Sequence, residues 1–152
     1  MKNVLAMLLL VLGGCTGGKT DMGLIFGDPS SRGYSQRVEY PGEEATMVFI
    51  SGQIPVDESG AVIGKDDLEK QTDQVFRNIL QQVEKAGGSV EDVVKINCYF
   101  KDISQIALFR NARDRYINLE RPPASTALQI ARFIHPDVLI EIEAIAIVPK
   151  KK

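Results

Sequence analysis

Hydrophobic and polar positions follow two different periods along the middle of the chain. From about Asp67, apolar residues recur every three or four positions, and Gly87-Gly88 follow the last of them. This spacing predicts a helix with one buried face, ended by glycines that tolerate a left-handed backbone. Residues 93–100 alternate instead, which predicts a half-buried strand. Its expected inner side carries Val94, Ile96, Cys98 and Phe100, and its outer side carries Lys95, Asn97 and Tyr99.

Shorter patterns predict the remaining elements. Ser104 is expected to cap a second helix, with apolar residues at helical spacing up to Ile117, and Pro122-Pro123 prevent its continuation. Further strands are predicted at Thr46–Ile50, Ala124–Ala131 and Val138–Val148, with turns at Asp57–Gly60 and His135–Asp137.

The order of the predicted elements indicates the fold class. Strands, a helix, a strand, a helix and two strands favour an α+β fold in which both helices cover one face of a single mixed sheet. Val138–Val148 carries apolar residues on both sides, so the face without helices would expose apolar side chains to water. We therefore expect self-association of the chain to cover that face.

Composition limits the function classes. The chain has 152 residues, enough for one domain with a substantial core, and a formal net charge of −2. No basic surplus is available to neutralise phosphates, so nucleic-acid binding is not expected. Two cysteines and one histidine, without a C-x-x-C pair, predict no metal site.

The N-terminal segment allows two incompatible interpretations. Gly13–Thr20 fits the phosphate-loop pattern, but the segment that follows contains three glycines and a proline and cannot form the helix that such a loop requires. The segment also resembles a bacterial lipoprotein signal. Lys2 precedes an apolar run over Val4–Leu12, and Gly13-Gly14-Cys15 follows that run.

The lipoprotein interpretation predicts a domain organisation. Residues 1–14 would be a signal peptide, Cys15 the lipidated N-terminus, residues 15–33 a flexible tether and residues 34–150 the folded domain. We expect a protein anchored by lipid to the cell envelope, on its periplasmic or extracellular face. The alternative is a cytoplasmic protein with an apolar, disordered start.

Four blocks of the sequence agree in order and spacing with a known family. They read ISGQIPVDESGAVIG, NILQQVEKAGGSVEDVVKINCYFKD, RPPASTALQIAR and IEIEAIAIV. From Gly33 to Val148 the chain resembles the RidA/YjgF family of reactive-intermediate deaminases. The resemblance implies a chorismate-mutase-like fold and a homotrimer whose inter-subunit clefts bind small carboxylic acids. It also implies hydrolysis of enamines and imines, such as 2-aminoacrylate or 2-iminobutanoate, to 2-oxo acids and ammonia, without a metal or organic cofactor.

The same resemblance assigns site residues. Imine hydrolysis needs a group that positions and activates water, and a carboxylate suits this task. Glu143 matches the family's water-handling glutamate, whereas Glu141, on the same side of the predicted strand, is expected to be an ordinary exposed charge. Tyr34 matches a tyrosine that covers the family's cleft, and Ser51 matches a pocket serine.

The chain departs from the family pattern at the arginine that binds the substrate carboxylate. Deaminating members have Pro-Ala-Arg-Ser where this chain has Pro123–Thr126, so Ser125 occupies the arginine position. Loss of such a charged pair typically costs about 2–5 kcal/mol of binding. Ala127 falls where some members have a cysteine, and its neighbouring backbone carbonyl is expected to hold a water. Arg110 aligns with a pocket asparagine and is a candidate replacement cation.

Two functions are consistent with these observations. The first is an exported deaminase of a small reactive imine or enamine, with a substrate shifted by the loss of the arginine. The second is a non-catalytic trimer that binds a small carbonyl or imine metabolite at the cell envelope. Ribonuclease activity, attributed to some relatives, is disfavoured by the acidic charge balance.

Overall fold

The computed structural model describes residues 22–151. Six strands form one sheet, and two α-helices and two short 3-10 turns connect them. The strands are β1 (Ile25–Pro29), β2 (Ser35–Pro41), β3 (Ala45–Gln53), β4 (Val93–Phe100), β5 (Ala124–Gln129) and β6 (Ile140–Pro149). The helices are α1 (Leu68–Lys85) and α2 (Ile106–Arg113), and the 3-10 turns span Val90–Asp92 and Ile103–Gln105.

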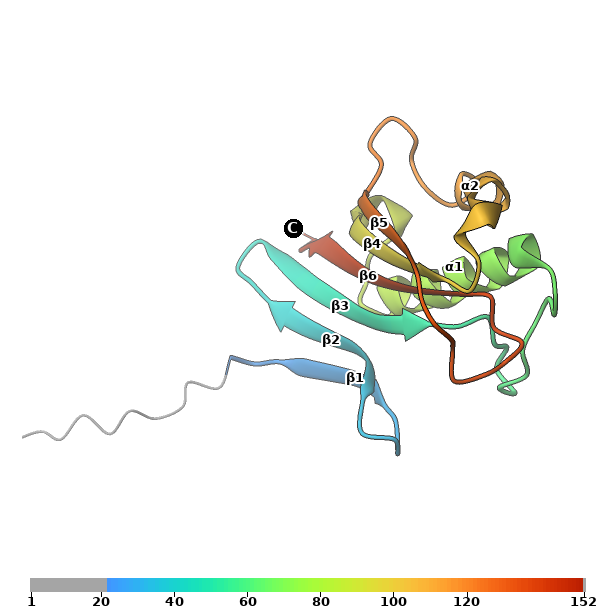
Figure 1. The fold of residues 1–152 in the computed structure, drawn as a ribbon. Helices are drawn as coiled ribbons and strands as arrows, with labels where there is room; N and C mark the ends of the chain where they lie inside the picture. Colours follow the sequence, from blue (N-terminus) through green and yellow to red (C-terminus); the bar gives the residue numbers. More distant parts are fainter. Residues whose placement is uncertain (1–21, 152) are drawn as a thin grey trace, which may run out of the picture.

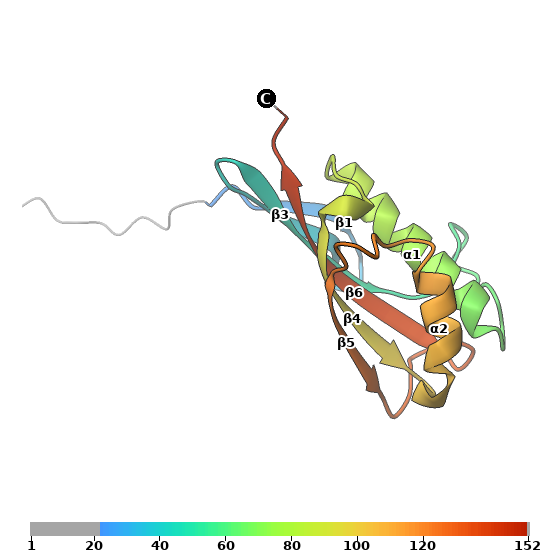
Figure 2. The same cartoon turned by 90° about the horizontal axis from the view of Figure 1, so that it is seen from above.

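The sheet is mixed, and both helices lie on one of its faces. The strand order is β1-β2-β3-β6-β4-β5, and every pair is antiparallel except β4–β5. A parallel pair needs a crossover connection, and α2 with its flanking loops provides it. Figures 1 and 2 show α1 and α2 on the same side of the sheet, with the opposite side bare. The predicted α+β architecture is confirmed, and we call the bare side the open face.

α1 forms where the apolar spacing predicts a helix. The Asp67 carboxylate accepts a hydrogen bond from the Lys70 backbone N–H at 3.0 Å, which satisfies one of the free donors at the helix start. At the other end, Gly87 has a φ of +83°, a conformation that glycine adopts without strain. The buried stripe between these ends consists of Leu68, Val75, Phe76, Ile79 and Val83.

The hydrophobic core lies between this stripe and the covered face of the sheet. β6 contributes every second residue from Ile140 to Val148, and β4 contributes its buried side from Ile96 to Phe100. The ring of Phe100 packs edge-on against Phe109 of α2, with ring centroids 5.1 Å apart. The alternation along β4 and β6 therefore places one side of each strand in the core and the other side on the open face.

The structure corrects the predicted start of the folded domain. Residues 25–29, predicted as part of the tether, form the edge strand β1, which pairs with β2. The Asp28 carboxylate binds Lys85 Nζ at 2.6 Å and Arg37 Nη1 at 3.5 Å, which ties β1 to β2 and α1. This strand contains a glycine and a proline and depends on backbone pairing, so its local sequence gave no periodic signal. The predicted signal peptide, Cys15 and the remainder of the predicted tether up to residue 21 lie outside the described residues.

The expected inner position of Val94 is wrong. A register shift between Val93 and Lys95 interrupts the pairing of β4 with β6. An extra residue at a bulge moves the side chains before it to the other face. As a result Val93 is buried and Val94 is exposed, while the alternation from Lys95 to Phe100 is as predicted.

The second helix is shorter than predicted, and Ser104 does not cap it. The Asp102 carboxylate caps the preceding 3-10 turn by accepting a hydrogen bond from the Ser104 backbone N–H at 3.0 Å, and α2 follows Gln105 without a side-chain cap. α2 ends at Arg113, and tighter turns continue the chain. Tyr116 still reaches the core, where its ring stacks on Phe76 at 5.2 Å between centroids. The helical spacing beyond Arg113 therefore reflects packing of successive turns and not a continuous helix.

Gln71 of α1 is a fully buried polar residue that fastens the loop before β6. Its side-chain Nε2 donates to the backbone oxygens of Gly64 and Asp137, and its Oε1 accepts from the Leu139 backbone N–H at 2.7 Å. Gln71→Ala leaves these buried groups without partners, so we expect it to lower the free energy of unfolding by about 3 kcal/mol in urea titrations. The matched change of the exposed Gln81 to alanine should alter it by less than about 0.5 kcal/mol. Equal stability of the two variants would contradict this role.

The open face is rich in apolar side chains. The register places Phe26, Val38, Phe49 and Ile145 in one row across four strands, and Tyr40, Met47 and Ile147 in the next. Phe26 is 61% exposed, and Tyr40, Met47, Phe49 and Ile147 are also exposed. A contiguous apolar surface of this kind is typical of an interface between proteins.

Candidate active site

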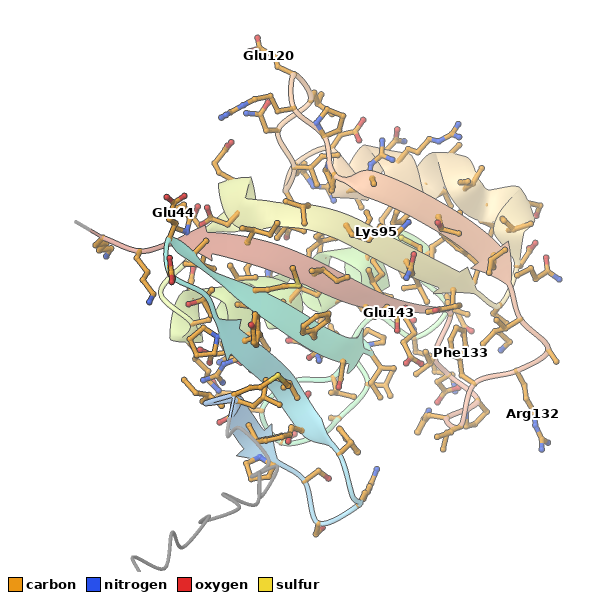
Figure 3. All side chains as sticks on the ribbon, turned by 90° about the vertical axis from the view of Figure 1, so that its left-hand side faces the viewer. Glu44, Lys95, Glu120, Arg132, Phe133 and Glu143 are labelled. Carbon is orange, nitrogen blue, oxygen red and sulfur yellow. The ribbon has the colours of Figure 1, made fainter. Side chains whose placement is uncertain are left out.

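Polar side chains from β4 and β6 lie beside these apolar rows on the open face. In the antiparallel register, Asn97 is opposite Glu143, Tyr99 is opposite Glu141, and Lys95 is opposite Ile145. Residues directly opposite in a ladder point to the same face, so these side chains share one surface. Figure 3 looks onto this face, with Lys95 and Glu143 labelled. The alternation of the sequence thus brings two carboxylates, an amide, a phenol and an ammonium together.

Glu143 is held by two donors from the neighbouring strand. Asn97 Nδ2 donates to Glu143 Oε1 at 2.7 Å, and the Tyr99 hydroxyl donates to the same oxygen at 2.9 Å. The hydrogen bond to Glu143 raises the pKa of Tyr99, with desolvation as the second cause, so the phenol stays protonated as a donor. The carboxylate is therefore fixed in orientation, and its Oε2 takes no hydrogen bond from residues 22–151.

Glu141 is the second carboxylate of this surface, and it is partly buried. Burial raises the pKa of the Glu141 carboxyl, and the charge of Glu143 raises it further. The pairing of β3 with β6 shifts between Ile50 and Gln53, and Gly52 in this irregular stretch lies against the Glu141 carboxylate. A Cβ at position 52 would collide with Glu141 Oε1. The expectation that Glu141 is an ordinary exposed charge is wrong, because neither the bulge nor the close approach of Gly52 is visible in the alternation of the sequence.

This raised pKa predicts how stability depends on pH. Between the ordinary glutamate value of 4.5 and the raised value, the folded protein binds more protons at Glu141 than the unfolded chain does. The contribution of Glu141 to the free energy of unfolding therefore falls as pH rises through this window. Glu141→Gln removes that contribution, so the variant should gain stability relative to wild type as pH rises above 4.5.

The measurement is urea unfolding at several pH values and one protein concentration, because association shifts apparent stability. Glu120→Gln, in the exposed loop that follows α2, is the control and should follow the wild-type pH profile. A Glu141→Gln profile parallel to wild type would show that the carboxyl is not perturbed.

A hollow of about 190 Å³ opens beside Glu143 on the open face. Its lining combines residues of β3 and β6, with the side chains of Phe49 and Ile145 on the open face, and the polar row of β4. The residues are Phe49, Ile50, Lys95, Asn97, Glu143, Ala144 and Ile145. A concave site with apolar walls and a few convergent polar groups is the usual form of a small-molecule site.

Two further predicted site residues lie near the ends of β2 and β3. Ser51 is part of the same irregular stretch of β3, and its hydroxyl donates to the Ser35 carbonyl at 2.7 Å. Tyr34 directly precedes β2 and is 45% exposed. Ser51 is thus already engaged in holding β2 to β3, while the tyrosine ring is accessible.

The remaining predicted site residues lie on the other side of the sheet. In the parallel pair, Ser125 is opposite Ile96 and Ala127 is opposite Cys98, so both belong to the face that carries the helices. Burial raises the pKa of the Cys98 thiol to about 12, and the Ser125 hydroxyl beside it acts in the opposite direction. Arg110 is an exposed residue of α2, the helix that lies on that side of the sheet (Figure 2). One chain therefore does not bring Ser125, Ala127 and Arg110 together with Glu143.

Among residues 22–151, no group of three or more histidine, cysteine, aspartate or glutamate side chains is arranged to hold a metal ion. Neither helix in this range has the length and apolar character needed to cross a membrane.

Comparison with known sequences gives the chain's relatives. Residues 28–148 match the family described as Endoribonuclease L-PSP. A 2-iminobutanoate/2-iminopropanoate deaminase of Salmonella typhimurium is 38% identical over 105 residues, which cover 67% of this chain and 80% of that protein. A RutC family protein of Pyrococcus abyssi is 39% identical over 113 residues, which cover 74% of this chain and 84% of that protein.

Solved structures share the fold. The yjgF gene product of E. coli superposes with a TM-score of 0.68 at 32% identity, over 78% of this chain and 90% of that one. RidA from an Antarctic Psychrobacter gives a TM-score of 0.68 at 35% identity, over 79% of this chain and 93% of that one. The single mixed sheet with two helices is therefore the architecture of these proteins as well.

Proposed function

We propose a function on the premise that this chain belongs to the Endoribonuclease L-PSP family, the family of the RidA and YjgF proteins. The protein hydrolyses a small imine or enamine to a carbonyl compound and ammonia. The observation that carries this proposal is the pair Glu141 and Glu143, two carboxylates in different environments on one hollowed sheet face. The deaminase of Salmonella typhimurium, at 38% identity, supports the same reaction class.

The reaction divides between the two carboxylates. Glu143, oriented by Asn97 and Tyr99, accepts a proton from a water molecule as the water oxygen bonds to the imine carbon. Glu141, whose pKa is raised by burial and by the charge of Glu143, donates a proton to the imine nitrogen. In the second half, Glu143 returns its proton to the nitrogen, the carbon–nitrogen bond breaks and ammonia leaves. Glu141 takes the hydroxyl proton, which forms the carbonyl group and restores both residues.

The complete site is assembled between copies of the chain in a homotrimer. The exposed apolar rows of the open face need a partner, and β5 is a free sheet edge. A neighbouring chain that sets its β5 edge against the open face brings Ser125 and Ala127 to the hollow, and Arg110 follows from α2. Tyr34 and Ser51 stand at the near end of the same cleft. This arrangement accounts for the separation of the predicted site residues within one chain.

The substrate is shifted from that of the arginine-bearing relatives. Ser125 offers one neutral hydrogen bond where those relatives are expected to offer a guanidinium. An imine whose binding does not depend on a bidentate carboxylate contact fits this cleft better. The N-terminal signal and Cys15 would hold the protein on the cell envelope, where the available imines differ from those of the cytoplasm.

The test is ammonia release from imines made in situ by an amino-acid oxidase acting on a panel of amino acids. The purified protein should accelerate ammonia formation and lower the amount of imine trapped by semicarbazide, for at least one side-chain class. If it accelerates none while a stable 2-oxo acid still binds, the second function, a metabolite-binding trimer at the envelope, replaces the first.

A further inference from the structure

The hollow on the open face holds one cation and one anion that do not neutralise each other. Both Lys95 and Glu143 line it. Lys95 Nζ donates to Thr126 Oγ1 at 2.7 Å, whereas Glu143 takes its two hydrogen bonds from Asn97 and Tyr99. No ion pair joins Lys95 to Glu143 within residues 22–151, although both residues line the same hollow. The Lys95 ammonium and the Glu143 carboxylate are thus held by neutral partners and not by each other. A ligand with a negative group at one end and a positive or proton-accepting nitrogen at the other could bind between them.

The sheet register sets the distance between the two charges. Lys95 is opposite Ile145, two residues along β6 from Glu143, so Lys95 and Glu143 are diagonal neighbours. Such neighbours are typically about 7–8 Å apart at their backbones. A small molecule with an anionic group and a nitrogen a few bonds away spans this gap. The hollow has a volume of about 190 Å³, which is enough for a small molecule of this kind.

The other walls of the hollow are apolar. Phe49 of β3 and Ile145 of β6 are directly opposite each other and face the cavity between the two charges. Such walls weaken the competition of water for the charged ends, so each ionic contact is stronger than on an open surface. They also favour a short hydrocarbon side chain on the ligand.

From this geometry we infer that Lys95 is the anion-binding residue of the hollow for the carboxylate-bearing imines of the proposed reaction. The ligand carboxylate accepts hydrogen bonds from Lys95 Nζ, and its nitrogen end points along β6 toward Glu143 and Glu141. The identification of the ligand as an imine rests on the proposed function. The assignment of Lys95 as the anion-binding residue depends only on the hollow and its lining. Lys95 thereby provides the positive charge that the family's arginine would provide at the position of Ser125. In the proposed trimer Lys95 belongs to the open face, and Ser125 comes from the β5 edge of the neighbouring chain.

The test compares Lys95→Met with Lys95→Arg. Methionine keeps an unbranched stem without the charge, and arginine keeps the charge. Binding of 2-oxobutanoate, a stable analogue with the same carboxylate, is measured by calorimetry. Lys95→Met should weaken it at least about 30-fold, the loss expected when one member of a charged hydrogen-bonded pair is removed. Lys95→Arg should recover most of that affinity, and Lys70→Met, an exposed residue of α1 away from the open face, should bind as wild type does.

A second measurement separates this inference from the deaminase proposal. With a carboxylate-bearing imine, Lys95→Met should raise KM at least about 30-fold and leave kcat within a few-fold. With the matched imine in which an amide replaces the carboxylate, KM should not change. If the protein deaminates nothing but 2-oxobutanoate binding still depends on Lys95, only the deaminase proposal fails. If wild type does not bind 2-oxobutanoate, or if Lys95→Met binds it equally well, the inference is overturned.

Discussion

Glu143→Gln is expected to lower kcat for imine hydrolysis by about 10²–10⁴-fold, the usual contribution of a positioned proton-transfer group. Glutamine keeps the shape of the side chain, so Asn97 and Tyr99 retain an acceptor in the same place. What it loses is the ability to take a proton from the attacking water. Initial rates of ammonia release, with oxidase activity held in excess, measure the effect.

The control for this variant is Glu44→Gln, at the turn between β2 and β3, away from the hollow and exposed. It removes the same charge and should retain wild-type rates. Thermal unfolding of both variants checks that the fold is intact. A folded Glu143→Gln protein with wild-type kcat would remove Glu143 from the mechanism and leave Glu141 as the only carboxylate of the site.

Ser125→Arg is expected to lower KM for 2-iminobutanoate by about 30-fold or more, because a charged pair with a carboxylate contributes about 2–5 kcal/mol. Ser125 is an exposed residue of the β5 edge whose hydroxyl lies beside the buried Cys98 thiol, so a longer side chain must extend outward from the edge rather than into the core. In the proposed trimer that side chain reaches into the cleft formed with the next subunit. Steady-state kinetics on carboxylate-bearing and neutral imines measure the change in preference.

Ala131→Arg adds the same charge just beyond the end of β5 and serves as the control. It should leave KM unchanged. If Ser125→Arg acts no differently from Ala131→Arg, the position does not line the substrate cleft. If the wild-type protein is inactive and Ser125→Arg alone creates deaminase activity, the binding function describes the native protein.

Sequence patterns were sufficient for elements whose side chains divide cleanly between core and solvent. α1 and β4 have strong periods, and the structure places them at the predicted residues within one position at each end. The same alternation placed Glu141 and Glu143 on one face. β1 is not predictable from the sequence, because its residues show no alternation of apolar and polar positions. Its place in the sheet depends on pairing with β2 and on the contacts of Asp28 with Lys85 and Arg37.

The candidate site was only partly predictable, because its chemistry depends on contacts between distant residues. The approach of Gly52 to Glu141 follows from an irregularity in β3, which one sequence does not reveal. The hydrogen bonds from Asn97 and Tyr99 to Glu143 require the register of β4 against β6. Likewise, the placement of Ser125 on the helix-bearing face follows from the parallel pairing with β4, which motif matching does not specify.

The central claim is that the site forms between subunits, and restoration of activity in mixed trimers tests it most directly. Glu143→Gln inactivates the open-face side of the cleft, and Ala127→Trp should block the β5 side. Each variant alone should be inactive. An active cleft needs an intact open face from an Ala127→Trp chain and an intact β5 edge from a neighbouring Glu143→Gln chain. In trimers assembled at random from an equal mixture, about one cleft in four meets both conditions, so about a quarter of the wild-type rate should be restored. Folded, fully mixed trimers with no more activity than the separate variants would show that both sides belong to one chain and would contradict the account.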